Sequence, residues 1–277
     1  MNKNVFHKIL LLSDITTIMN CSQSSKTFYK WCNDNSFWFL LCQRDHKDDY
    51  MDFDKPFFKE IYVLCYTLRP FTRNERIKKL YETYSINISS VQPSEIVKIP
   101  EEVCHMTKLR SIVIRNSKLK SIPINIKQLI HLKSLYLSRV NINIIPIELC
   151  QLVHLELLEL SKNNIVTIPD EIGELTQLIN LDLSFNDITH VPNTIQQLVN
   201  LKILNLDNNR LIEISDEMCN LPKLEWYYLA NNLIKNTPSK KQIEQLKKII
   251  VINLTNNQIM YVRNEIKNIV KIDWNYY

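Results

Sequence analysis

One pattern repeats along most of this chain and constrains its fold more than any other feature. From Leu155 the sequence reads LELLELSKNNIVTIPDEIGELTQ, and from Leu178 it reads LINLDLSFNDITHVPNTIQQLVN. Both segments have 23 residues and fit LxxLxLxxNxIxxIPxxIxxLxx, which gives every residue a position from 1 to 23. A repeat of this length buries its apolar side only by stacking on its neighbours. The sequence therefore predicts a solenoid.

The same frame extends over residues 86–271. The repeats start at Ile86, Leu109, Leu132, Leu155, Leu178, Leu201, Leu224 and Ile249. The step is 23 residues as far as Leu224, whose own repeat has 25 because two residues are added around positions 239–242 of the chain. A further strand begins at Ile272. We expect eight repeats and a terminal strand over residues 86–277.

The spacing within a repeat predicts how the repeat is built. Positions 1, 4 and 6 follow the period of two of a strand and its lead-in, so they point inward. Positions 11, 14, 18 and 21 return along the back and fill the core. Proline at position 15 fixes φ and favours an extended or short turn-like back over a long helix. These prolines are Pro100, Pro123, Pro146, Pro169 and Pro192.

Position 9 is asparagine in five repeats. A buried asparagine both donates and accepts, so it can satisfy backbone groups where the chain turns away from the strand. The five are Asn163, Asn186, Asn209, Asn232 and Asn257, whereas the first three repeats have Ser94, Ser117 and Val140. Serine can replace part of this function. Val140 cannot form a side-chain hydrogen bond, so we expect a local water or backbone adjustment there.

This pattern resembles the 23-residue, proline-containing class of the leucine-rich-repeat family. The resemblance implies an α/β fold, a curved solenoid with a parallel sheet on its concave side.

Residues 1–45 break the period and favour short helices instead. Val5, Ile9 and Leu10 are helically spaced, and Asp14 can cap a second helix that carries Ile15 and Ile18. Four short helices in this length form a very small core, which a partner often completes.

The order VFHKILLLSDITTIMNCSQSSKTFYKWCNDNSFWFLLCQRD resembles the F-box family. The similarity includes the Asp14–Ile15 step, the aromatic residues Phe28 and Trp31, and Trp38 before Leu41, although Met1 and Asn2 stand where the family usually has Leu-Pro. It implies an all-α module that binds a Skp1-like adaptor and, through it, a cullin. The residues expected at the adaptor are Val5, Ile9, Leu10, Ile15, Ile18 and Trp38. The alternative is an unrelated helical cap of the solenoid.

Residues 46–85 are expected to connect the two parts. Amphipathic helices over residues 57–68 and 74–84, separated by Pro70, would cover the open end of the first repeat, as a solenoid requires.

Composition excludes several other classes of function. A single glycine, Gly173, leaves no Gly-rich loop for a phosphate or dinucleotide. Seven cysteines without a CxxC pair are typical of reduced thiols in the cytoplasm or nucleus. His131 and His154 share position 23 of adjacent repeats but make an incomplete metal site. No catalytic set can be assembled, so we expect a protein that is not an enzyme and holds no cofactor or metal.

The sequence also limits the partners. No signal peptide and no apolar run long enough to cross a membrane is present, so no membrane partner is expected. Residues 235–277 contain eight basic and three acidic residues, so this stretch alone carries a charge equal to the net +5 of the chain. A basic end could contact an acidic partner or nucleic acid, but no nucleic-acid motif accompanies it. We interpret it as a solvated face and expect no nucleic-acid partner.

The concave face is the expected site for a protein target. Trp226 and Tyr228 lie two residues apart on one predicted strand and should face the same way. Glu159 and Asp182 occupy equivalent places on adjacent strands, and such like charges favour a basic group on the partner. Alternatively, the aromatic residues only follow strand preference. The expected target-binding residues are Tyr136, Glu159, Asp182, Phe185, Asp207, Trp226 and Tyr228.

Together these features suggest the substrate receptor of a Skp1–cullin–F-box type ubiquitin ligase. The alternative is a non-catalytic scaffold or decoy that binds a Skp1-like or other partner without ubiquitination.

Overall fold

The structure is a computed structural model that describes residues 85–87, 99, 103–104, 106–119, 121–246 and 248–259. The chain divides into two units, residues 1–82 and 83–277, and every described residue lies in the second. The helices expected in residues 1–45 and 46–84, and the strand expected from Ile272, lie outside the described residues.

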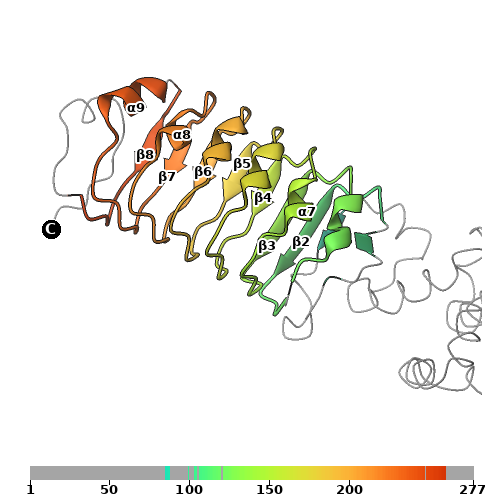
Figure 1. Ribbon diagram of the computed structural model, residues 1–277. Helices are drawn as coiled ribbons and strands as arrows, with labels where there is room; N and C mark the ends of the chain where they lie inside the picture. The colour runs from blue at the N-terminus through green and yellow to red at the C-terminus, as the bar shows by residue number, and fades with distance from the viewer. Residues whose placement is uncertain are drawn as a thin grey trace, which may run out of the picture. The chain divides into compact units, whose positions relative to one another are not determined.

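Eight strands form one parallel sheet in chain order (Figure 1). They are β1 (Ser85–Asn87), β2 (Ser111–Arg115), β3 (Ser134–Ser138), β4 (Leu157–Glu159), β5 (Asn180–Asp182), β6 (Ile203–Asn205), β7 (Trp226–Tyr228) and β8 (Val251–Asn253). From β2 to β7 the register advances by one regular repeat at each strand, as Ser111 opposite Ser134 illustrates. Trp226 then pairs with Val251, which confirms the two residues added to the repeat at Leu224.

The first strand departs from the predicted frame. Ser85 pairs with Ser111 and Asn87 with Val113, so β1 starts three positions earlier in the chain than a regular repeat would place it. Ile86 therefore occupies position 4, not position 1. Ser94, expected at position 9, lies outside the described residues. The first repeat is longer than the others, so counting back 23 residues from Leu109 does not reach its position 1. The residue reached is Ile86, and its isoleucine side chain fits the pattern only by coincidence. Later in that repeat the frame is right.

The core follows the predicted positions in each repeat. In the repeat that starts at Leu178, the inward side chains have relative exposures of 0–8%. These are Leu178, Leu181, Leu183, Ile188, Val191, Ile195 and Leu198. In the first repeat, Ile99, Val103 and Met106 are buried at positions 14, 18 and 21. The core is therefore a continuous column of aliphatic side chains, repeated from one repeat to the next.

The back of each repeat is short, as the prolines predict. Figure 1 shows the short helices in a row along one side of the sheet. Four of them begin directly after a proline whose φ lies between −70° and −67°. These are η4 (Ile124–Gln128), α7 (Ile147–Cys150), η5 (Asp170–Glu174) and η6 (Asn193–Gln197). In α8 (Asp216–Cys219) and α9 (Lys240–Gln245), Ser215 and Ser239 instead cap the helix by accepting a backbone N–H.

The buried asparagines connect neighbouring repeats. The amide of Asn186 donates to the carbonyl oxygens of Leu160 (3.0 Å) and Leu183 (2.9 Å), and its Oδ1 accepts from the amide of Ile165 (3.0 Å). Asn163, Asn209, Asn232 and Asn257 make the corresponding bonds. The expected role of position 9 is confirmed.

The two described repeats without this asparagine differ from each other. At Val140 the expected backbone adjustment occurs: Asn141 has φ 65°, and Asn163 Oδ1 accepts from both Val140 N (3.0 Å) and Ile142 N (3.3 Å). The expectation that serine replaces asparagine is wrong at Ser117. Its hydroxyl is buried and has no hydrogen-bond partner among the described residues, because it is too short to reach the backbone groups that asparagine reaches.

Candidate protein-interaction surface

The side of the sheet that faces away from the core presents the outward side chains of the strands. In β4 to β8 the first and third residues are half-buried, whereas the middle residue is buried. In β7, for example, Trp226 and Tyr228 share this side, as predicted, and Tyr227 enters the core. We call this side the open face.

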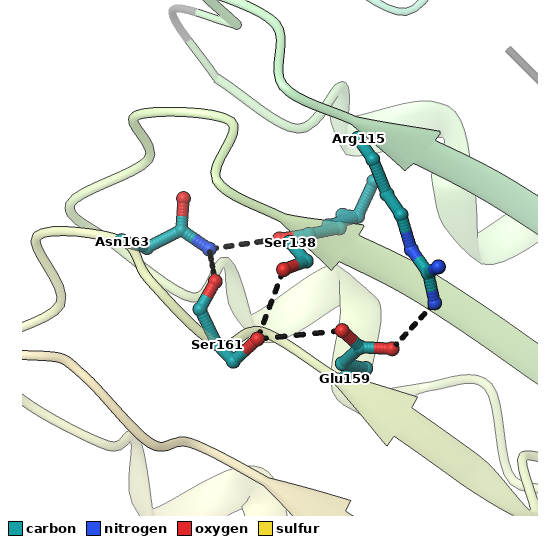
Figure 2. A network of polar contacts seen from close by, with 6 residues as sticks. Arg115, Ser138, Glu159, Ser161 and Asn163 are labelled. Carbon is teal, nitrogen blue, oxygen red and sulfur yellow. Dashed lines mark hydrogen bonds and ion pairs between the residues drawn. The ribbon is translucent and has the colours of Figure 1, made fainter. Parts of the chain in front are cut away.

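A charged bridge crosses the open face near its start. Arg115 Nη2 lies 3.1 Å from Glu159 Oε2, so the side chain reaches from β2 over β3 to β4. On the way its guanidinium lies 5.5 Å from the ring centre of Tyr136. Figure 2 shows Arg115 directed at Glu159. A cation stacked on an aromatic ring and paired with a carboxylate has a defined geometry, in contrast to an isolated surface ion pair.

Hydrogen bonds hold the other carboxylate oxygen of Glu159. Ser161 Oγ donates to Glu159 Oε1 (3.3 Å), and Ser138 Oγ lies 3.0 Å from Ser161 Oγ (Figure 2). Asn163 donates to the carbonyl oxygens of Ser161 (3.2 Å) and Leu137 (2.8 Å), which joins this network to the buried asparagines. Glu159 is therefore fixed from both sides before any partner arrives.

The electrostatic expectation for Glu159 needs a correction. Glu159 and Asp182 are register neighbours, as predicted. Glu159, however, is already paired with a cation of the same chain, Arg115. The sequence frame missed this pair because the two residues lie two repeats apart and at different positions, 7 and 5. Asp182 forms no ion pair among the described residues; its Oδ1 accepts from Ser184 N (2.9 Å).

Asp207, in the repeat after Asp182, is a second carboxylate that forms no ion pair among the described residues. Asp207 Oδ1 accepts from the backbone amide of Ala230 at 2.6 Å. Burial raises the pKa of Asp207 to about 6, and Asp182 adds to the rise, while the bond from Ala230 opposes it. Asp182 and Asp207 thus form an acidic pair between Glu159 and the aromatic strand β7.

Position 8 forms a second, distinct feature. Arg139, Lys162 and Phe185 follow the strands in consecutive repeats, with φ 55°, 56° and 56°, and all three are exposed or half-exposed. Lys162 Nζ lies 5.3 Å from the ring centre of Phe185. The sequence pattern grouped Phe185 with the strand face, but it belongs to the turn that follows. The signal that could have shown this is the asparagine at position 8 of other repeats, because asparagine tolerates positive φ.

Other residues considered in the sequence do not gather. His131 and His154 are exposed, and within the described part of the chain no three His, Cys, Asp or Glu side chains group as metal ligands would. Burial raises the pKa of the Cys150 and Cys219 thiols to about 12, which makes both poor nucleophiles. None of the described helices has the length and apolar character needed to span a bilayer.

Comparison with known families identifies this architecture. A family model described as a leucine-rich repeat region matches residues 147–271. Residues 147–271 form a leucine-rich-repeat region. Such a region is a protein-interaction domain. The match does not extend to residues 1–45.

Solved leucine-rich-repeat structures have the same fold. A leucine-rich-repeat protein of Leptospira interrogans is 25% identical, with a TM-score of 0.54, over 65% of this chain and 51% of that one. The ectodomain of the Arabidopsis thaliana receptor kinase GASSHO1/SCHENGEN3 is 28% identical (TM-score 0.57), over 65% of this chain and 23% of that one. The plant peptide hormone receptor RGFR1 is 32% identical (TM-score 0.52), over 58% and 26%.

This chain spans about half of the Leptospira protein and about a quarter of each plant receptor. No curated protein matches its sequence.

Proposed function

We propose that this protein is the target-binding subunit of a Skp1–cullin–F-box type ubiquitin ligase. The proposal is carried by a sequence resemblance to the F-box over residues 1–45, in the same chain as a leucine-rich-repeat region with an open face. The first would bind a Skp1-like adaptor, and through it a cullin. The second would bind a target protein.

The adaptor-binding residues in this proposal are those that resemble the F-box, and they lie outside the described residues. They are Val5, Ile9, Leu10, Ile15, Ile18 and Trp38. The chain would work without a cofactor, in the reducing environment of the cytoplasm or nucleus. It would supply proximity and orientation, while partner enzymes carry out the covalent chemistry.

The target would bind on the open face. Trp226 and Tyr228 supply an aromatic anchor on one strand, of the kind that dominates binding energy at interfaces. The acidic pair of Asp182 and Asp207 lies on the preceding repeats and favours a basic group on the target, in place of the Glu159 site that Arg115 already answers. Tyr136 and Glu159 complete the proposed surface on the open face, and Phe185 extends it to the turn after β5.

Two similar structures support a polypeptide as the partner. The GASSHO1/SCHENGEN3 ectodomain was solved in complex with CASPARIAN STRIP INTEGRITY FACTOR 2, and RGFR1 in complex with RGF2. Because the described repeats have the same fold, a protein or peptide is the class of ligand that this surface fits best.

Binding to a purified Skp1 homologue tests the proposal. The full chain should bind it at micromolar concentration or tighter, and Ile9→Asp with Ile15→Asp should abolish binding. Ile124→Asp is the matched control, because Ile124 is 64% exposed on the back of the repeats and should tolerate a charge. If the full chain binds no Skp1 homologue, the adaptor assignment is wrong. If it binds the adaptor but a reconstituted ligase never modifies a bound target, the scaffold or decoy function replaces it.

A further inference from the structure

We propose that Arg139, Lys162 and Phe185, which we call the position-8 ridge, bind an acidic peptide segment that carries an apolar side chain. The inference rests on the proposed function only in assuming that the solenoid binds a protein target. It names a surface at the ends of the strands, beside the open face, and the chemistry of the segment that would occupy it.

The backbone of the ridge is held in a conformation that its residues disfavour. Every described repeat from Leu109 onward has a residue with φ between 53° and 56° at position 8. Four of these residues are asparagine, which adopts this region easily: Asn116, Asn208, Asn231 and Asn256. A bulky residue there is a steric outlier, and residues held in such conformations concentrate at functional sites. Phe185, with φ 56°, is the clearest case.

The side chains of the ridge are available to a ligand. Phe185 is 48% exposed, and Arg139 and Lys162 also reach solvent. Neither cation forms an ion pair with any described residue. The ridge is therefore a local excess of positive charge that ends in an aromatic ring.

The arrangement of the three side chains selects the ligand. Lys162 Nζ lies 5.3 Å from the ring centre of Phe185, so one ligand group can meet the ammonium while its neighbour packs on the ring. Parallel strands lie about 4.8 Å apart, so the three residues span roughly 10 Å along the solenoid. Every second side chain of an extended peptide faces the same way, so about five residues present three side chains to the ridge. Two carboxylates followed by one apolar side chain would match the ridge.

The surrounding charges favour a peptide over nucleic acid. Glu159, Asp182 and Asp207 lie on the neighbouring strands and loops. Asp187, two residues after Phe185, is paired with Arg210 at 2.6 Å. A continuous row of phosphates would meet these carboxylates, whereas a short peptide can place its acidic groups on the two cations alone. Nucleic-acid affinity also depends on many phosphate contacts, and the ridge supplies two cations.

Peptide binding to the full-length protein tests the ridge. The probes are fluorescent peptides with the pattern Glu-Ser-Glu-Ser-Phe and its reverse, and the same peptides with Gln in place of Glu. We expect the acidic peptides to bind at least tenfold more tightly than the Gln peptides. Phe185→Asn, and Arg139→Asn with Lys162→Asn, should each weaken binding at least tenfold. Because other repeats already hold asparagine at this position, neither variant should melt below the wild type.

Matched controls and other ligands complete the test. Ile124→Asn and Lys127→Asn change an exposed apolar residue and an exposed cation on the back of the repeats, and they should leave peptide binding unchanged. The proposal is overturned if no acidic peptide binds, if the ridge variants bind as the wild type does, or if an oligothymidine binds more tightly than the peptides. Binding to a Skp1 homologue, measured on the same variants, should not change. If the wild type does not bind the Skp1 homologue, the ligase proposal fails while the peptide-binding proposal still stands on its own test.

Discussion

At the scale of the residue, a buried asparagine links the backbones of two neighbouring repeats. Asn186 donates to carbonyl oxygens of its own repeat and of the preceding one, and its Oδ1 accepts from a backbone amide of the preceding repeat. Removing its side chain leaves those buried backbone groups without partners, and each such group costs about 1–3 kcal/mol. We predict that Asn186→Ala lowers the free energy of unfolding by roughly 2–4 kcal/mol, measured by urea denaturation. The control is Asn164→Ala, in the preceding repeat. Because Asn164 is exposed, this change should alter the free energy of unfolding by less than about 0.5 kcal/mol.

At Tyr227, removing a polar group should raise the stability of the fold, in contrast to Asn186. Tyr227 replaces the leucine or isoleucine of position 4, and its hydroxyl is buried without a hydrogen-bond partner among the described residues. A phenylalanine keeps the ring and removes the desolvated hydroxyl. Tyr227→Phe should therefore raise the free energy of unfolding by about 1 kcal/mol. A loss of stability in the same urea titration would show that the hydroxyl has a partner in the folded protein.

Asp207 makes stability depend on pH. Its pKa of about 6 lies above the ordinary value of 3.8, so the folded protein binds this proton more tightly than the unfolded chain does. The contribution of this group to stability therefore falls as pH rises from about 4 to about 6, and stays low above that. Asp207→Asn should raise the melting temperature at about pH 8, and the gain should shrink as the pH approaches about 4. An equal gain at every pH would contradict this assignment.

At the scale of the element, each repeat depends on a few fully buried side chains. Leu183, at position 6 after β5, has no exposed surface. We predict that Leu183→Ala lowers the free energy of unfolding by roughly 2–5 kcal/mol, because the truncation leaves a cavity between stacked repeats. The control is Ile179→Ala, since Ile179 is 39% exposed at position 2. Equal unfolding curves for Leu183→Ala and the wild type would contradict the predicted register.

How far the sequence predicts an element depends on whether its signal is local. The strands β2 to β8 and the short backs follow from the repeat period and from the prolines, which act within one repeat. The start of β1 did not follow, because the pairing of Ser85 with Ser111 depends on an irregular first repeat. The bridge from Arg115 to Glu159 joins residues two repeats apart. The sequence did not predict the turn at Arg139, Lys162 and Phe185, because arginine, lysine and phenylalanine rarely adopt a positive φ.

At the scale of the whole molecule, the proposed function divides the work between two parts of one chain. Stacked repeats hold the open face in place, since each repeat gains its stability from its neighbours. A rigid surface presents its anchors at little entropic cost when a target binds. The F-box-like residues 1–45 would join this surface to the adaptor. The two activities should therefore be separable by substitution.

One measurement tests that division most directly: quantitative mass spectrometry of the proteins that copurify with the full chain and with two variants. We predict that Trp226→Ala with Tyr228→Ala keeps the Skp1-like adaptor and cullin but loses at least one other partner, while Ile9→Asp with Ile15→Asp does the reverse. Ile124→Ala with Ile147→Ala, on the exposed back, should lose neither. Loss of the same partners by the two variants, or loss of partners only through changes on the back, would contradict this division of the molecule.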